Sequence, residues 1–161
     1  MIPNLKSKIQ NPKWYDMEAQ LTTSEIKAKQ QLLQDYEPAQ KAFATLEKYN
    51  GRLDISFDEL WAEKTGQTYD PNQPKSLWQS TLKVLREELC GSEGFRAQFQ
   101  EYTKNPGSAP LLTGLIVSLT TLAGLPLDPA ISTVIVLYLL KVGLKIFCEY
   151  TQPVKKDVDN G

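Results

Sequence analysis

Two apolar segments in the last quarter of the chain constrain the fold more than any other feature. They lie within residues 109–150 and are separated by the helix breaker Leu125-Pro126-Leu127-Asp128-Pro129. No upstream segment is comparably apolar. Helical spacing in both segments predicts a helical hairpin, and its burial in protein or in lipid decides the class of the protein.

Local signals predict helices along the rest of the chain. Thr22 and Glu25 have the spacing of a capping box, as do Ser56 and Glu59. Pro38 is expected to split a helix because it lacks a backbone donor. Since no stretch alternates like a β-strand for long, the sequence predicts an all-α fold.

The expected architecture is a compact bundle of about six helices with the hairpin at its centre. A polar N-terminal arm is expected over residues 1–20, a single helical domain over 21–152 and a solvated tail over 153–161. At 161 residues, the chain is long enough to form one domain with its own core.

Three properties favour a protein core over lipid for the hairpin: the length of its segments, their charge, and the need of the upstream helices for an apolar covering element. The first segment would rise only about 22 Å as a helix, which is short of the ~30 Å bilayer core. Lys141 and Lys145 interrupt the second segment and, with Tyr138, are expected to form one stripe that touches water. The aromatic and leucine stripes of the upstream helices need a covering element, and the hairpin supplies it.

Composition excludes several classes of chemistry. The chain has no histidine, which removes histidine acid–base catalysis and the commonest metal ligands. Its net charge of -1 gives no reason to expect nucleic acid as a partner. The two cysteines, Cys90 and Cys148, are interpreted as free thiols of a cytoplasmic protein, although their positions do not show whether they meet.

No motif for a catalytic, metal or cofactor site is present. The acidic residues of one short segment, Asp54, Asp58, Glu59 and Glu63, lack the spacing of a calcium loop and are interpreted as a solvated helix face. Three tryptophans, Trp14, Trp61 and Trp78, are interpreted as core or edge anchors rather than as a ligand cage. We therefore predict a non-enzymatic protein without a cofactor, metal or small-molecule ligand.

Three stretches, Leu82–Gly91, Gly124–Ala130 and Lys141–Glu149, are similar to small all-helical proteins of bacteria, cyanobacteria in particular. Some proteins of that kind are encoded beside signalling or defence enzymes. The resemblance implies an accessory or effector role, and it assigns no function to any residue.

The sequence therefore predicts a protein that acts through protein–protein contact or self-association. Gly143 is expected inside the second hairpin helix, where a glycine indicates close approach of a neighbouring helix. The alternative is a membrane-active effector, associated with the inner membrane, whose hairpin inserts and oligomerises. The residues predicted to form the core or interaction surface are Leu115, Ile116, Leu119, Ile135, Leu139, Gly143 and Phe147.

Overall fold

A computed structural model describes residues 20–66, 77–122 and 127–150. Within these ranges the chain is helical, which confirms the all-α class, and an isolated bridge between Gln20 and Arg52 is its only strand-like pairing. The elements are α2 (Thr23–Leu32), η2 (Glu37–Ala39), α3 (Gln40–Lys48), α4 (Leu53–Thr65), α5 (Leu77–Gly91), α6 (Glu93–Lys104), α7 (Ala109–Leu122), α8 (Pro129–Val142) and α9 (Leu144–Tyr150). The predicted arm, the loop after Gly66, most of the breaker and the tail lie outside the described residues.

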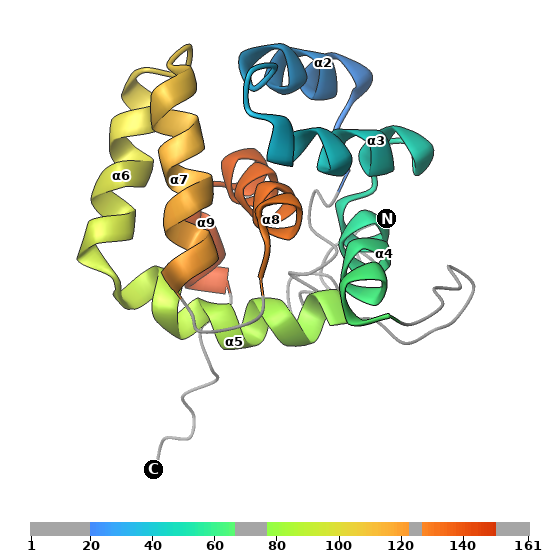
Figure 1. Ribbon diagram of the computed structural model, residues 1–161. Helices are drawn as coiled ribbons and strands as arrows, with labels where there is room; N and C mark the ends of the chain where they lie inside the picture. The colour runs from blue at the N-terminus through green and yellow to red at the C-terminus, as the bar shows by residue number, and fades with distance from the viewer. Residues whose placement is uncertain (1–19, 67–76, 123–126, 151–161) are drawn as a thin grey trace, which may run out of the picture.

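Helix α8 forms the centre of the fold. Every side chain from Ala130 to Leu139 is buried, and α3, α4, α7, α9 and η2 all contact this helix. Figure 1 shows α8 in the middle, with α6 and α7 on one side, α3 and α4 on the other, and α5 beneath. The prediction that the second hairpin helix lies at the centre is confirmed.

Helix α7 contributes the other half of the hairpin and covers one side of α8. Its apolar face, formed by Leu112, Leu115, Ile116 and Leu119, is fully buried. The Thr120 hydroxyl donates a 2.9 Å hydrogen bond to Ser132 Oγ and joins the two helices where their buried polar groups meet. No helix among the described residues has the length and apolar character that crossing a membrane requires.

An aromatic chain connects α8 to its neighbours. The Trp78 ring of α5 meets the Tyr138 ring edge to face at 4.9 Å between centroids, and Phe57 of α4 lies 5.4 Å from Trp78. Phe147 of α9 meets Tyr138 from another direction at 6.2 Å. The interpretation of Trp78 as a core anchor is thus confirmed.

The beginning of α2 is fixed against the α3–α4 turn. The backbone N–H of Leu21 donates to Gly51 O over 2.8 Å, and a Cβ added at Gly51 would lie 2.1 Å from Leu21 O. Gly51 also has a φ of +87°, so glycine is required there both for space and for backbone conformation. This turn follows the end of α3.

Several helix ends agree with the sequence. Thr22 and Glu25 form the reciprocal capping box of α2, and Asp128 accepts a hydrogen bond from Ile131 N at the start of α8. Pro38 lies in η2, a short 3-10 helix that separates α2 from α3. These helix ends depend on residues close together in the sequence, so they form without contacts to distant parts of the chain.

The predicted capping box at Ser56 is wrong. Helix α4 already begins at Leu53, so Ser56 lies inside it, is fully buried and donates to Thr45 O at 3.4 Å. A Ser56 cap would start the helix at Phe57, but the turn that pairs with Leu21 leads into a helix that begins four residues earlier.

The prediction that Gly143 lies inside one long helix is also wrong. Gly143 ends α8 with a φ of +97°, and α9 begins at the next residue. A Cβ at Gly143 would meet nothing within 4 Å, so close helix packing does not explain this glycine. Because the helix breaks here, the expected stripe does not form: Tyr138 is fully buried and Lys145 belongs to α9.

The interpretation of both cysteines as free thiols is wrong as well. Cys90 near the end of α5 and Cys148 of α9 form a disulfide across a sequence separation of 58 residues, with Cα atoms 5.8 Å apart. Helix packing that no sequence spacing displays brings the two residues together.

Candidate functional site: an apolar groove between α2 and α7

A groove of about 720 Å³ lies between the end of α2 and the outer face of α7. Figure 1 shows these two helices on either side of the end of α8. The groove is lined by Leu32, Leu33, Asp35, Tyr36, Gln98, Ala109, Pro110, Thr113, Gly114, Val117 and Ser118.

Helix α7 supplies one wall of the groove. Ser108 begins the helix, because its hydroxyl accepts from Leu111 N at 3.2 Å and its carbonyl accepts from Leu112 N at 3.1 Å. With the apolar face turned toward α8, the opposite face presents small residues at helical spacing, among them Gly114 and Ser118. The groove wall is thus shallow and close to the backbone.

The second wall is the turn after α2. Tyr36 N donates to Leu33 O at 2.9 Å, and Gln40 Nε2 donates to the same carbonyl at 2.9 Å. Leu33 is itself 1% exposed and anchors the turn in the core. These contacts hold the half-buried Leu32 and Tyr36 at the rim.

The lining carries little charge. Asp35 is its one ionisable acidic or basic side chain, and it lies exposed at the α2 end. Helix α7 contains no Asp, Glu, Lys or Arg along its whole length. Its Val117 side chain is nonetheless 47% exposed. A surface helix normally presents charged side chains to water, whereas the groove face of α7 presents only uncharged ones.

One polar pair borders the groove on the α6 side. The Ser118 hydroxyl donates to Gln98 Oε1 at 2.8 Å. This bond joins α7 to α6 and uses the hydroxyl that would otherwise face the groove. The hydroxyl side chains of α7 therefore bond to two neighbouring helices: Ser118 bonds to α6, and Thr120 bonds to Ser132 of α8.

A smaller recess of about 200 Å³ lies toward the beginning of α2 and holds the Lys141–Glu25 ion pair. Lys141 Nζ lies 3.0 Å from both carboxylate oxygens of Glu25. Burial raises the pKa of Glu25, but hydrogen bonds from Thr22 and Lys141 outweigh burial, so its pKa lies below 4.5. Glu25 thus serves the α2 capping box and the contact with α8 at once.

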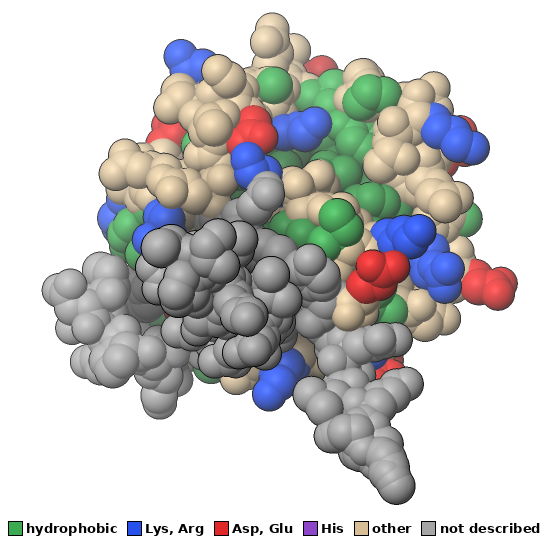
Figure 2. All heavy atoms as spheres, turned by 180° about the vertical axis from the view of Figure 1, so that it is seen from behind, with side chains coloured by type: hydrophobic (Ala, Val, Ile, Leu, Met, Phe, Trp, Pro, Cys, Tyr) green, Lys and Arg blue, Asp and Glu red, His purple; other side chains and the backbone are tan. Residues whose placement is uncertain are grey.

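Figure 2 shows hydrophobic side chains gathered over the upper part of the face opposite to Figure 1, with Lys and Arg beside them.

The interpretation of the α4 acidic residues as a solvated face holds only in part. Asp58 is 8% exposed, and its carboxylate accepts hydrogen bonds from Leu77 N and Trp78 N. Glu59 accepts from Lys48 and from the Tyr49 hydroxyl, whereas Glu63 forms an ion pair with Lys41 nearer the surface. These carboxylates have structural partners, and no group of acidic or cysteine side chains in the described part of the chain is arranged to hold a metal ion.

The predicted core or interaction residues lie away from the groove. Leu115, Ile116 and Leu119 of α7 face α8, and their side chains have no exposed surface. Ile135 and Leu139 are equally buried within α8, and Phe147 is buried in α9. Gly143 is half-buried at the α8–α9 junction. The structure therefore brings all of these residues except Gly143 together as core.

The groove residues were missed by sequence reasoning, although one signal was present. The stretch from Asn105 to Leu127 carries no charge, and a helix packed on two sides still has a third face. The α2 wall has no sequence signal at all, because its position depends on the long-range contact with α3 and α4.

Comparison of the chain with known protein families, with curated proteins and with solved structures finds no match. The resemblance to bacterial helical proteins therefore stays a prediction.

Proposed function

We propose that this chain is a non-enzymatic protein that acts by binding another protein, and that the α2–α7 groove receives an amphipathic helix of that partner. The observation that carries the proposal is the exposed, charge-free face of α7 beside the Leu32 and Tyr36 wall. An apolar helix face bordered by a second apolar wall is the usual arrangement in helix-in-groove recognition.

The dimensions and charge of the groove define the partner. The α7 wall from Ala109 to Ser118 rises about 14 Å, which matches two to three turns of a docked helix. Gly114 and Thr113 allow close approach of a partner backbone. Asp35 supplies negative charge at one end, so the partner helix is expected to carry Lys or Arg there.

The buried hairpin residues support the groove as the surface of contact. Self-association through Leu115, Ile135 or Leu139 would require these side chains to leave the core. The groove offers apolar area without that cost. Accessory or effector activity in a bacterial cell would follow from such binding, as the sequence resemblance implies.

The membrane-active alternative has less support. Helices α7 and α8 have 14 residues each and rise about 21 Å, whereas the bilayer core measures ~30 Å. Insertion would also remove the central helix from its neighbours and separate Lys141 from Glu25. We therefore treat leakage of intact vesicles as a contradicting result.

Photo-crosslinking tests the groove. A photoreactive amino acid at Val117 is expected to capture a second protein in cells of the source organism. The same residue at Val84 of α5 is the matched control, since Val84 is 54% exposed and Val117 is 47% exposed. Equal capture at both positions would contradict the proposal. If Val117 captures only a second copy of this chain, the groove mediates self-association. That result would overturn the proposal that the partner is a different protein.

A substitution at Gly114 provides the second arm. A Cβ there would meet nothing within 4 Å, so Gly114→Trp is expected to fill the groove without unfolding the chain and to abolish capture at Val117. Gly94→Trp adds the same bulk to α6, where a Cβ would meet only Ser92 Oγ at 4.0 Å, and is expected to leave capture unchanged. If the folded Gly114→Trp variant still captures a second protein at Val117 to the same extent, the groove is excluded as the binding surface.

A further inference from the structure

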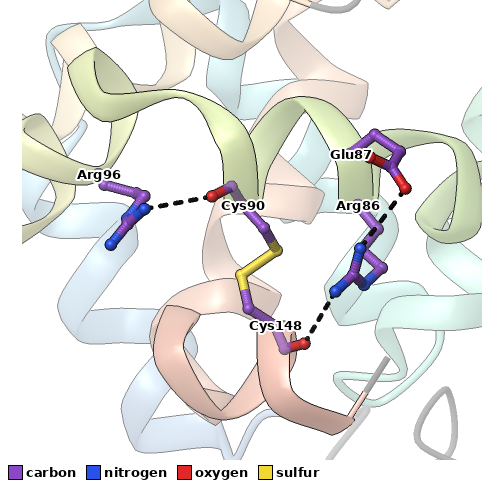
Figure 3. Close-up of a disulfide and its surroundings, with 5 residues drawn as sticks. All are labelled: Arg86, Glu87, Cys90, Arg96 and Cys148. Atoms are coloured by element: carbon purple, nitrogen blue, oxygen red, sulfur yellow. Dashed lines mark hydrogen bonds and ion pairs between the residues drawn. A yellow bond between two sulfur atoms is a disulfide. The ribbon is translucent and has the colours of Figure 1, made fainter. Parts of the chain in front are cut away.

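The Cys90–Cys148 disulfide joins the end of α5 to α9, and both cysteines are half-buried. Figure 3 shows the two sulfur atoms between these helices, with a guanidinium on either side. Partial exposure leaves the bond within reach of a thiol from outside, which a structural disulfide sealed in a core would not be.

Two of the three arginines of the chain are placed at this disulfide. Arg86 Nη2 donates to Cys148 O at 3.4 Å, and Arg96 Nη1 donates to Cys90 O at 3.3 Å. The Arg86 side chain is 15% exposed, and its Nε is buried without a hydrogen-bond partner among the described residues. Its Nη1 lies 3.6 Å from Glu87 Oε2, so the guanidinium contacts both that exposed carboxylate and the Cys148 carbonyl.

The arginines matter for thiol chemistry. A positive charge near a cysteine stabilises its thiolate, which is both the nucleophile and the leaving group of thiol–disulfide exchange. Arg86 and Arg96 therefore place cations at the backbone carbonyls of Cys148 and Cys90, the two residues whose sulfur atoms exchange would release.

Helix α9 is short and begins directly after a glycine with a positive φ. It has seven residues, and Gly143 joins it to α8 at a φ of +97°, a conformation that favours glycine. Phe147 is its buried aromatic anchor, whereas Ile146 is 46% exposed. The disulfide is the one covalent link between α9 and α5.

We propose that this disulfide is a redox latch, reduced by a dithiol protein, and that its reduction releases α9 from α5. A thiolate of the dithiol attacks one sulfur, the Sγ–Sγ bond breaks, and its electron pair leaves on the other cysteine. The second thiol of the dithiol then attacks the mixed disulfide. The partner leaves as a disulfide, and this chain gains two electrons and two protons as a pair of thiols.

Release of α9 uncovers a specific surface. Phe147 leaves its place against Tyr138, and the Trp78–Tyr138 aromatic chain becomes accessible from the α9 side. The inference is independent of the groove, which lies on α2 and α7.

Hydrogen–deuterium exchange of the full chain, with dithiothreitol as the reductant, tests the latch. Reduction is expected to raise deuterium uptake over Leu144–Tyr150 to that of an unprotected peptide, while α4 and α7 stay protected. The double variant Cys90→Ser/Cys148→Ser is expected to show this uptake without reductant. Unchanged uptake in α9 would overturn the proposal, as would equal loss of protection in every helix.

The rate of reduction tests the arginines. Arg96→Gln is expected to slow reduction by dithiothreitol severalfold at neutral pH, because it removes an exposed cation beside Cys90. Lys83→Gln removes the same charge from an exposed position of α5 and is expected to leave the rate unchanged. Equal rates in the two variants would contradict the assigned role of the guanidinium groups.

Discussion

The Asp58 carboxylate of α4 caps the described start of α5 through the backbone of Trp78. Asp58 Oδ1 accepts hydrogen bonds of 3.1 Å from Trp78 N and from Leu77 N. The Trp78 side chain, only 1% exposed, then fills the space between Phe57 and Tyr138. One buried acid thus sets the position of the largest aromatic group beside α8.

Replacing Asp58 by alanine is expected to destabilise the fold substantially. Asp58→Ala leaves two backbone donors unpaired, which costs about 2 kcal/mol of unfolding free energy in urea titrations. Asp54→Ala removes the ion pair with Arg52 nearer the surface and is expected to cost about 0.5 kcal/mol. Equal losses of unfolding free energy in the two variants would show that the Asp58 cap contributes no more stability than a surface ion pair.

Truncation of Leu139 tests the central position of α8. Leu139 has no exposed surface, so Leu139→Ala is expected to cost about 2–5 kcal/mol through lost burial and the resulting cavity. Ile146→Ala, at a side chain 46% exposed, is expected to change stability by less than about 0.5 kcal/mol. Urea unfolding followed by far-ultraviolet circular dichroism measures both, and a small loss for Leu139→Ala would contradict its burial.

The Glu25–Lys141 pair is expected to make α2 sensitive to acid. The pKa of Glu25 is below 4.5 in the fold, so its stabilising contribution is complete above pH 4.5 and disappears as the pH falls through the lowered value. The advantage of the native chain over Glu25→Gln should therefore vanish on acidification. Thermal unfolding between pH 6 and pH 3 measures it, and an advantage that persists at the lowest pH would exclude this cause.

The Tyr49 phenol is expected to lose its proton only at unusually high pH. Burial, followed by its hydrogen bond to Glu59, raises the pKa of Tyr49 to about 12. Because the neutral phenol is the stabilised form, its contribution is complete below about pH 10 and is lost as the pH rises through about 12. Ultraviolet absorbance of ionised tyrosine should lose its latest component in Tyr49→Phe; an unchanged profile would be inconsistent with the Glu59 contact.

The features that follow from neighbouring residues are the ones that sequence predicts correctly. The Thr22–Glu25 box and the Asp128 cap depend on three or four consecutive residues, so local chemistry determines them. Burial of the hairpin was predictable too, because its apolar content exceeds what a surface can carry.

The remaining features depend on which helices meet. Ser56 fails as a cap because the Gly51 turn, paired with Leu21, starts α4 earlier. The Cys90–Cys148 bond spans 58 residues, and the groove joins two helices from opposite ends of the chain. Such contacts have no periodicity or spacing to reveal them.

Amide hydrogen exchange of α8 in detergent-free buffer tests the central claim most directly. The account predicts that the amides from Ala130 to Leu139 are the slowest of the chain and exchange only with global unfolding, since five neighbouring elements shield them. Exchange in α8 as fast as in α2, or protection that develops only after vesicles are added, would contradict the claim that this chain's own helices bury the hairpin.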